Sequence, residues 1–161
     1  MNSGIRLRQV SLAVVIAAAY TVLTVSLGPL GYSWLQVRIS EALTPLPYLF
    51  GLPAVIGLAL GAFISNVFSP VGLPDIIFGT ALTLLSAELT WKLNLRSKLL
   101  ACLYPVIVNA LGVSAYVAGF YGVPYAITVI SIGAGELIAA VVIGYPLLVA
   151  MERINSKDLQ G

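Results

Sequence analysis

The stretch ALTPLPYLFGLPAVIGLALGAFISNVF, residues 42–68, decides how many times the chain can cross a membrane. It is predominantly apolar, but Pro45, Pro47, Gly51 and Pro53 interrupt its first half. A transmembrane helix needs about 20 apolar residues, and a proline inside it removes a backbone hydrogen bond and kinks it. The stretch is therefore either one kinked span or two shorter helices that turn around Gly51 and Pro53.

The composition of the whole chain is typical of an integral membrane protein. Apolar residues make up 60% of the 161 residues, charged residues make up only 9%, and the mean hydropathy is +1.03. A soluble protein of this size needs far more charge to cover its surface. The length suits five or six spans with short loops, so we expect residues 1–161 to form a single transmembrane domain in the cell membrane.

The distribution of basic residues favours six spans over five. With six spans, seven of the eight lysines and arginines lie on one side of the membrane, and only Arg38 lies on the other. With five spans, the best orientation gives six against two. Because basic loops are retained in the cytoplasm, we predict an all-α bundle of six transmembrane helices with both termini cytoplasmic. The predicted spans are approximately residues 9–27, 41–51, 53–68, 75–92, 98–118 and 124–151.

Small residues at four-residue spacing predict close contacts between helices. Ala13 and Ala17 form such a pair in the first span, and Gly57, Gly61 and Ser65 form a second set. Helices in a bilayer associate tightly where small side chains let their backbones approach. Both sets therefore indicate packing faces.

Glu136 is the strongest candidate for a binding residue, because an ionisable group at membrane depth costs roughly 2.5–3.5 kcal/mol to insert. It lies near the middle of the last span, with Gly133, Ala140 and Gly144 on the same helical face. These small residues leave room for another helix or for a ligand beside the carboxylate. The sequence therefore leaves two interpretations open: a ligand-binding acid, or a carboxyl group that bonds a neighbouring helix or is protonated.

Four further charged residues have structural interpretations, and three of them, Arg38, Glu41 and Asp75, have a binding interpretation as well. Arg38 and Glu41 can form an ion pair three residues apart if a helix has begun, or Glu41 can suit the positive end of that helix. Asp75 follows a proline and opens a span, a position at which an N-cap is the simpler interpretation. Glu88 precedes Lys92 by four residues, and an ion pair at the helix end explains it adequately.

Two amides and an aromatic residue complete the candidates. Asn66 and Asn109 lie at membrane depth, where an amide bonds another helix as readily as a ligand. Trp34 suits the aromatic belt at the membrane interface, and it also suits a surface on which a planar ligand stacks.

Missing motifs exclude several classes of protein. The chain has no histidine and one cysteine, so it offers no His/Cys metal cluster, and it contains no phosphate-binding glycine loop with a lysine. No nucleophile with an adjacent base and no TVGYG-like ion filter is present. We therefore expect no enzyme, no cofactor and no nucleic-acid partner. Acids, amides and aromatics together suit a planar, donor-rich or cationic small molecule better than a metal ion.

Four motifs in the same order along the chain resemble those of the QueT family. They are QVRISEAL with Pro47 after it, GLALG followed by Ser65 and Asn66, DIIFGT, and GAGEL, at residues 36–43, 57–61, 75–80 and 133–137. The resemblance spans nearly the whole chain. It implies a six-helix substrate-binding (S) component of an energy-coupling factor (ECF) transporter that takes up queuosine precursors.

The resemblance also implies partners and a ligand. The partners are a transmembrane T component, which S components of this kind contact through an alanine-xxx-alanine face such as Ala13 and Ala17, and two cytoplasmic ABC ATPases. The ligand is a 7-deazaguanine base, with the aminomethyl form as the first candidate.

The predicted site has Arg38 and Glu41 at its rim and Glu136 as the deeper anchor. A carboxylate can accept two hydrogen bonds from a guanine-like edge, a second acid can meet an aminomethyl cation, and Arg38 or an amide can donate to the ring carbonyl. The complete predicted set is Trp34, Arg38, Glu41, Asn66, Asp75, Asn109 and Glu136. The alternatives are an S component for another vitamin or nucleobase and a structural or assembly membrane protein, with an intramembrane enzyme as a more distant one.

Overall fold

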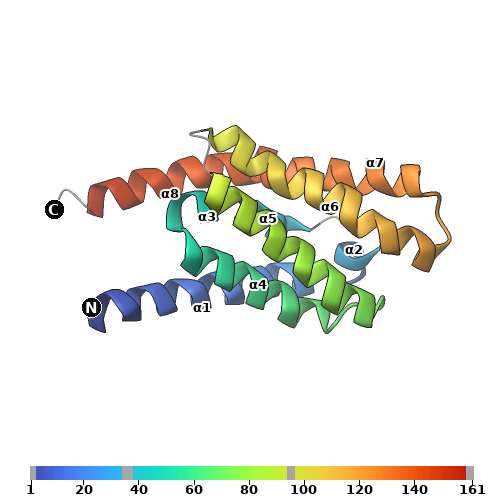
Figure 1. Ribbon diagram of the computed structural model, residues 1–161, viewed down its shortest axis with the longest axis horizontal. Helices are drawn as coiled ribbons and strands as arrows, with labels where there is room; N and C mark the ends of the chain where they lie inside the picture. Colours follow the sequence, from blue (N-terminus) through green and yellow to red (C-terminus); the bar gives the residue numbers. More distant parts are fainter. Residues whose placement is uncertain (1–2, 34–37, 94–96, 159–161) are drawn as a thin grey trace.

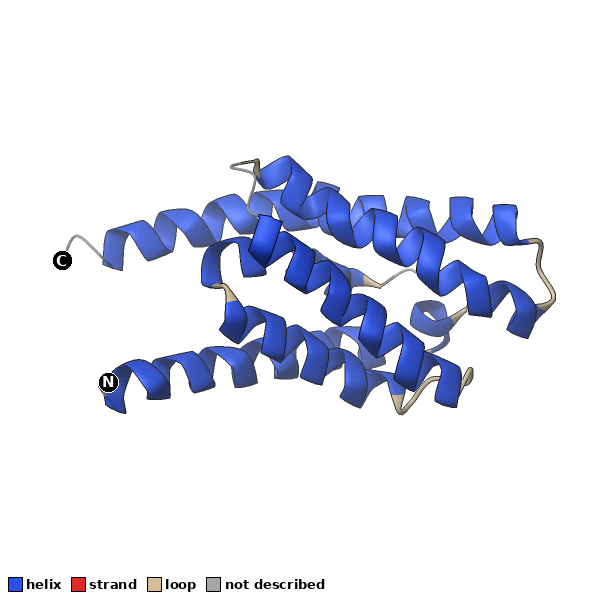
Figure 2. Ribbon diagram, in the orientation of Figure 1, coloured by secondary structure: helices blue, strands red, loops and turns tan. Residues whose placement is uncertain are grey.

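The computed structural model describes residues 3–33, 38–93 and 97–158, and this part of the chain is helical without a strand (Figure 2). Four segments within it are long and apolar enough to cross a membrane, namely Arg6–Ser26, Asp75–Leu93, Lys98–Tyr121 and Tyr125–Asn155. Leu52–Asn66 is a shorter apolar helix. The predicted all-helical membrane fold is therefore confirmed.

The elements follow one another with few residues between them. In chain order they are α1 (Ser3–Ser26), α2 (Pro29–Tyr32), a 3-10 helix (Ile39–Leu43), α3 (Pro47–Phe50), α4 (Leu52–Asn66), a π-helical turn (Asp75–Gly79), α5 (Thr80–Leu93), α6 (Lys98–Tyr121), α7 (Tyr125–Glu136), a second π-helical turn (Leu137–Ile143) and α8 (Gly144–Asp158). The Ser97 side chain caps the start of α6, and Gly122, with a left-handed backbone, ends it.

Both termini lie at the same end of the bundle, together with α3 (Figure 1). The opposite end holds α2 and the connection between α6 and α7 (Figure 1). Residues 39–50 therefore return the chain from the α2 end to the α3 end, where α4 starts. Whether residues 1–161 form a single transmembrane domain stays a prediction.

Residues 42–68 contain two shorter helices and a break, not one kinked span. The break is at Gly51, whose φ of +60° is a conformation that glycine adopts at no steric cost. A Cβ at this position would also lie 3.1 Å from the Trp91 Nε1 atom. Before the break, the chain forms only the 3-10 helix and α3, because Pro45 and Pro47 offer no backbone N–H donors. The predicted second span thus consists of short helical pieces.

The tightest helix contact joins α1 to α4. A Cβ on Gly57 would lie 2.7 Å from the Ala13 carbonyl oxygen, and one on Gly61 would lie 2.9 Å from that of Ala17. Only glycine lets the two backbones approach this closely. The packing face predicted at Gly57 and Gly61 is therefore present.

The same contact places the backbone of Ala13 and Ala17 against α4. Their exposed fractions are 8% and 7%, and their carbonyl oxygens are the atoms that lie closest to Gly57 and Gly61. The predicted T-component contact through this pair stays a prediction.

The molecule buries polar side chains and exposes apolar ones. Val22 and Ile130 are 62% and 73% exposed, whereas Thr24, Ser65 and Asp75 are fully buried. An outer surface of this kind suits contact with lipid tails. The polar interior is where a binding site must be sought.

Candidate functional site

The predicted charged and amide residues lie in the interior of the bundle. None of the six that the structure describes is more than 4% exposed; they are Arg38, Glu41, Asn66, Asp75, Asn109 and Glu136. Trp34 lies outside the described residues. The six form two groups, and three buried or partly buried tyrosines join them. We name the groups the ion-pair cluster (Tyr32, Arg38, Asn66, Asp75 and Tyr116) and the carboxylate cluster (Tyr20, Glu41, Asn109 and Glu136).

Arg38 and Asp75 form the centre of the ion-pair cluster. The Arg38 Nη2 atom lies 3.3 Å from Asp75 Oδ2, and its Nε donates to the Gly31 carbonyl oxygen at 2.8 Å. The Tyr116 hydroxyl donates to Asp75 Oδ1 at 2.5 Å. Burial alone would lower the pKa of the Arg38 guanidinium, but the Asp75 carboxylate raises this pKa above its ordinary value. Arg38 is therefore charged and paired.

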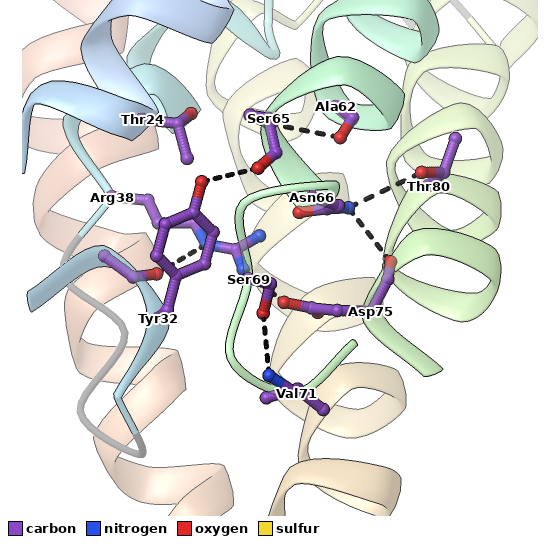
Figure 3. A network of polar contacts seen from close by, with 12 residues as sticks. Thr24, Tyr32, Arg38, Ala62, Ser65, Asn66, Ser69, Val71, Asp75 and Thr80 are labelled. Carbon is purple, nitrogen blue, oxygen red and sulfur yellow. Dashed lines mark hydrogen bonds and ion pairs between the residues drawn. The ribbon is translucent and has the colours of Figure 1, made fainter. Parts of the chain in front are cut away.

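The remaining members join α2 and α4 to this pair (Figure 3). The Tyr32 hydroxyl donates to the Ser65 carbonyl oxygen at 2.6 Å, and its ring centroid lies 5.5 Å from the Arg38 guanidinium carbon. The Asn66 Nδ2 atom donates to the backbone carbonyl oxygen of Asp75 at 3.0 Å. The cluster thus connects three segments through hydrogen bonds and one buried ion pair.

Two local interpretations, an ion pair between Arg38 and Glu41 and an N-cap at Asp75, are wrong in this region. Arg38 pairs with Asp75 rather than with Glu41, because its backbone is extended (φ −112°, ψ 100°) and helical i,i+3 geometry does not apply. Asp75 caps no helix: the turn that it opens has no side-chain cap, and its carboxylate is held by Arg38 and Tyr116. The ion pair predicted between Glu88 and Lys92 is confirmed, at 2.8 Å.

The carboxylate cluster brings together two acids from distant segments. Asn109 of α6 donates from Nδ2 to Glu136 Oε1 at 2.9 Å and to Glu41 Oε2 at 3.5 Å. The Tyr20 hydroxyl of α1 donates to Glu41 Oε1 at 2.5 Å. No lysine or arginine in the described ranges forms an ion pair with either acid. The two carboxyl groups are held by neutral donors.

Several buried polar atoms in and beside the clusters have no hydrogen-bond partner in the described part of the chain. They are Asn66 Oδ1, Asn109 Oδ1, Ser114 Oγ and Glu136 Oε2. A buried polar atom that stays unpaired costs about 1–3 kcal/mol, so native proteins nearly always satisfy such atoms. The two amide oxygens, and Glu136 Oε2 when this acid is ionised, can only accept hydrogen bonds, which favours a ligand that donates them.

The backbone departs from regular α-helix beside one acid of each cluster. Asp75 is the first residue of one π-helical turn, and Glu136 directly precedes the other. Such turns inside helices are frequent at functional sites. Gly79 lies close to both groups: a Cβ there would lie 3.0 Å from Asn66 Nδ2 and from Asp75 Oδ1, so a larger residue would make these side chains shift.

A comparison with known families places the chain in a class of transporters. The family model described as QueT transporter matches residues 10–153, which is most of the chain. The protein belongs to the QueT transporter family. Neither a search of curated proteins nor a search of solved structures gave a match. Membership of the QueT family implies a membrane transport role of the S-component type and favours a transport subunit over an enzyme.

Sequence reasoning missed three residues of this QueT family site. Tyr20 holds Glu41, Tyr116 holds Asp75, and Gly79 leaves room for the Asp75 carboxylate. Tyr20 could have been found, because it follows Ala13 and Ala17 on the packing face of α1 and is a polar group at membrane depth. Gly79 lies within the motif DIIFGT, but nothing in the sequence indicated its role, which depends on contacts made by the folded chain.

Proposed function

We propose that the protein is the substrate-binding subunit of an ECF-type importer and captures a 7-deazaguanine base from outside the cell. The carboxylate cluster carries this proposal, because it holds two buried acids without an ion-pair partner among the described residues. The aminomethyl form of the base is the first candidate ligand. A T component and two cytoplasmic ATPases would supply the energy of transport.

The unpaired oxygen atoms support a donor-rich planar ligand. A guanine-like edge presents a ring N–H and an exocyclic amine side by side, and Glu136 Oε2 and Asn109 Oδ1 are acceptors that can receive such donors. Hydrogen bonds to a carboxylate are stronger than those between neutral groups. Glu136 is therefore the proposed anchor for the base.

Glu41 supports a cationic substituent on that base. Its carboxylate interacts electrostatically with Arg38 but forms no ion pair with it, so it can still meet a ligand ammonium group. Arg38 is already held by Asp75 and Gly31, and its proposed role is to fix the segment that leads into Glu41. The ion-pair cluster then acts as the rigid rim of the site.

The charge distribution supports capture from the outer side. Helix α1 begins and α8 ends at the end of the bundle that holds both termini, and α2 lies toward the opposite end (Figure 1). The start of α1, the end of α5, the start of α6 and the end of α8 carry Arg6, Arg8, Lys92, Lys98 and Arg153. Basic residues concentrate on the cytoplasmic side. We therefore propose that both termini lie in the cytoplasm. The ligand would then enter from the opposite end of the bundle.

The test is a binding panel with the purified full-length protein in detergent. Aminomethyl-7-deazaguanine, the unsubstituted 7-deazaguanine and guanine are compared by calorimetry and by the shift in thermal midpoint. Glu136→Gln and Glu41→Gln should each weaken binding of the aminomethyl base by about 10- to 100-fold, the loss of one charge-assisted interaction of about 1.5–3 kcal/mol. Glu88→Gln is the matched control, since this exposed acid lies near the end of α5 and pairs only with Lys92 among the described residues.

Three outcomes would contradict the proposal in different ways. If Glu136→Gln and Glu41→Gln bind as well as Glu88→Gln does, the site is elsewhere. If another base or vitamin stabilises the protein and 7-deazaguanines do not, the chain is an S component for a different substrate. If no ligand stabilises it and no ATPase module co-purifies, the polar interior serves assembly alone.

A further inference from the structure

A groove of about 550 Å³ opens between the N-terminal half of α1, the end of α3 with the start of α4, and the C-terminal end of α8. It lies at the end of the bundle where both termini meet (Figure 1), and no residue of the carboxylate cluster lines it. Arg8 lines it together with the polar side chains of Gln9, Ser11 and Asn155. None of its described lining residues is acidic, and the rest of the lining is apolar.

Arg8 differs from the lysines at the same end of the molecule. Lys92 pairs with Glu88 at 2.8 Å and Lys98 pairs with Glu152 at 2.6 Å. Arg8 is exposed and forms no ion pair within the described ranges. A guanidinium binds phosphate oxygens through paired N–H donors, so an unpaired one above an apolar groove suits an anionic head group.

A smaller apolar cavity of about 150 Å³ continues the groove into the membrane-spanning part of the chain. The two share Leu12, Val15 and Phe50 as lining residues, and the smaller one reaches Ala19. An α-helix rises 1.5 Å per residue, so the path along α1 from Arg8 to Ala19 is about 16 Å long. That length is about half of the 30 Å hydrocarbon core, which is the depth that one acyl chain occupies.

We propose that this combined groove is a binding site for an anionic phospholipid of the leaflet at the terminal end. The phosphate of the head group contacts Arg8, the neighbouring amide and hydroxyl side chains bind its remaining oxygens, and one acyl chain lies along Leu12, Val15 and Phe50. Basic pockets between transmembrane helices are known to bind anionic head groups in this way. A lipid fits better than a protein segment for two reasons. The lining has one cation, Arg8, at its opening, and its apolar part continues from there to Ala19, the depth that an acyl chain reaches.

The test compares three probes on the delipidated full-length protein. Dioleoyl phosphatidylglycerol is anionic, dioleoyl phosphatidylcholine has the same chains with a zwitterionic head, and glycerol phosphate has the charge without the chains. Native mass spectrometry and the thermal midpoint should report preferential binding of phosphatidylglycerol. Arg8→Gln should weaken that binding about fivefold, the effect of one basic residue on an anionic lipid, whereas Lys92→Gln, with the same change in net charge, should leave it unchanged.

A second variant keeps the test decisive if Arg8→Gln folds poorly. Val15→Phe places a larger side chain where the two parts of the groove meet and retains all charges. It should abolish the preference for phosphatidylglycerol. The proposal is overturned if both lipids bind equally, or if Arg8→Gln and Lys92→Gln have equal effects. It is also overturned if glycerol phosphate binds as tightly as the lipid. A last contradicting outcome is that Arg8→Gln loses a co-purified protein instead of lipid.

Discussion

The two buried clusters place acids in similar surroundings but balance them differently. Asp75 in the ion-pair cluster faces a guanidinium and a phenol, so its charge is compensated within the protein. Glu136 in the carboxylate cluster faces an amide, and one of its oxygen atoms has no partner in the described part of the chain. A cluster whose charges are matched within the protein stabilises the fold, whereas a cluster with an unmatched acid is suited to a ligand. The distinction can be tested by removing one acid from each.

Asp75→Asn should have the largest effect on stability. It leaves the Arg38 guanidinium buried without its ion-pair partner, which destabilises a protein by about 3–5 kcal/mol. Chemical unfolding in detergent measures this loss, with Glu88→Gln as the control because that ion pair is exposed. If both variants unfold at the same denaturant concentration, the ion-pair cluster does not stabilise the fold.

Glu136→Gln should separate binding from stability. The variant keeps an oxygen that accepts from Asn109, and it removes a buried acid that no cation neutralises in the described ranges. Burying a charge without a partner is unfavourable, so the unfolding free energy without ligand should stay constant or rise. The same unfolding experiment measures it beside the binding loss of about 10- to 100-fold. A fall in stability as large as that of Asp75→Asn would remove the difference between the clusters.

Tyr116→Phe should have the smallest effect on ligand affinity of the three variants, and it should sharpen the assignment of the rim. It removes one hydrogen bond to Asp75 and leaves the ion pair with Arg38 in place. Stability should fall by about 1.5–3 kcal/mol, the contribution of a hydrogen bond to a charged group, and ligand affinity should change less than twofold. Thermal unfolding and calorimetry on the same preparation check both values. A tenfold loss of affinity would instead make Tyr116 a ligand contact.

Sequence reasoning found the groups of the site but not their partners. Apolar runs and scarce charge were enough to predict helices, and membrane depth singled out Glu136 and Asn109. The pairing depends on how each helix is rotated in the bundle. Arg38 and Asp75 are 37 positions apart, and Asn109 and Glu41 are 68 apart, so no local pattern connects them. The capping prediction for Asp75 was wrong because a local rule was applied where a distant arginine determines the geometry.

The small-residue faces show the same limit. Spacing alone predicted that Gly57 and Gly61 lie at a close contact, and they do. Spacing could not say which helix fills the opposite side: the backbone of Ala13 and Ala17 in α1 lies against these glycines, and contact of the alanine pair with a partner protein stays a prediction. A periodic pattern identifies a packing face but not its neighbour.

The π-helical turn after Glu136 has a consequence for how such a site changes through evolution. A π turn contains one more residue than an α-helical turn, so it shifts the phase of the helix that precedes it relative to α8. Deleting one residue between positions 137 and 143 would restore α-helical spacing and rotate Glu136 by about 100° relative to α8. The acid would then turn away from Asn109 although no side chain of the site had been replaced. Insertions and deletions in this segment are thus a route to a new ligand that point substitutions cannot follow.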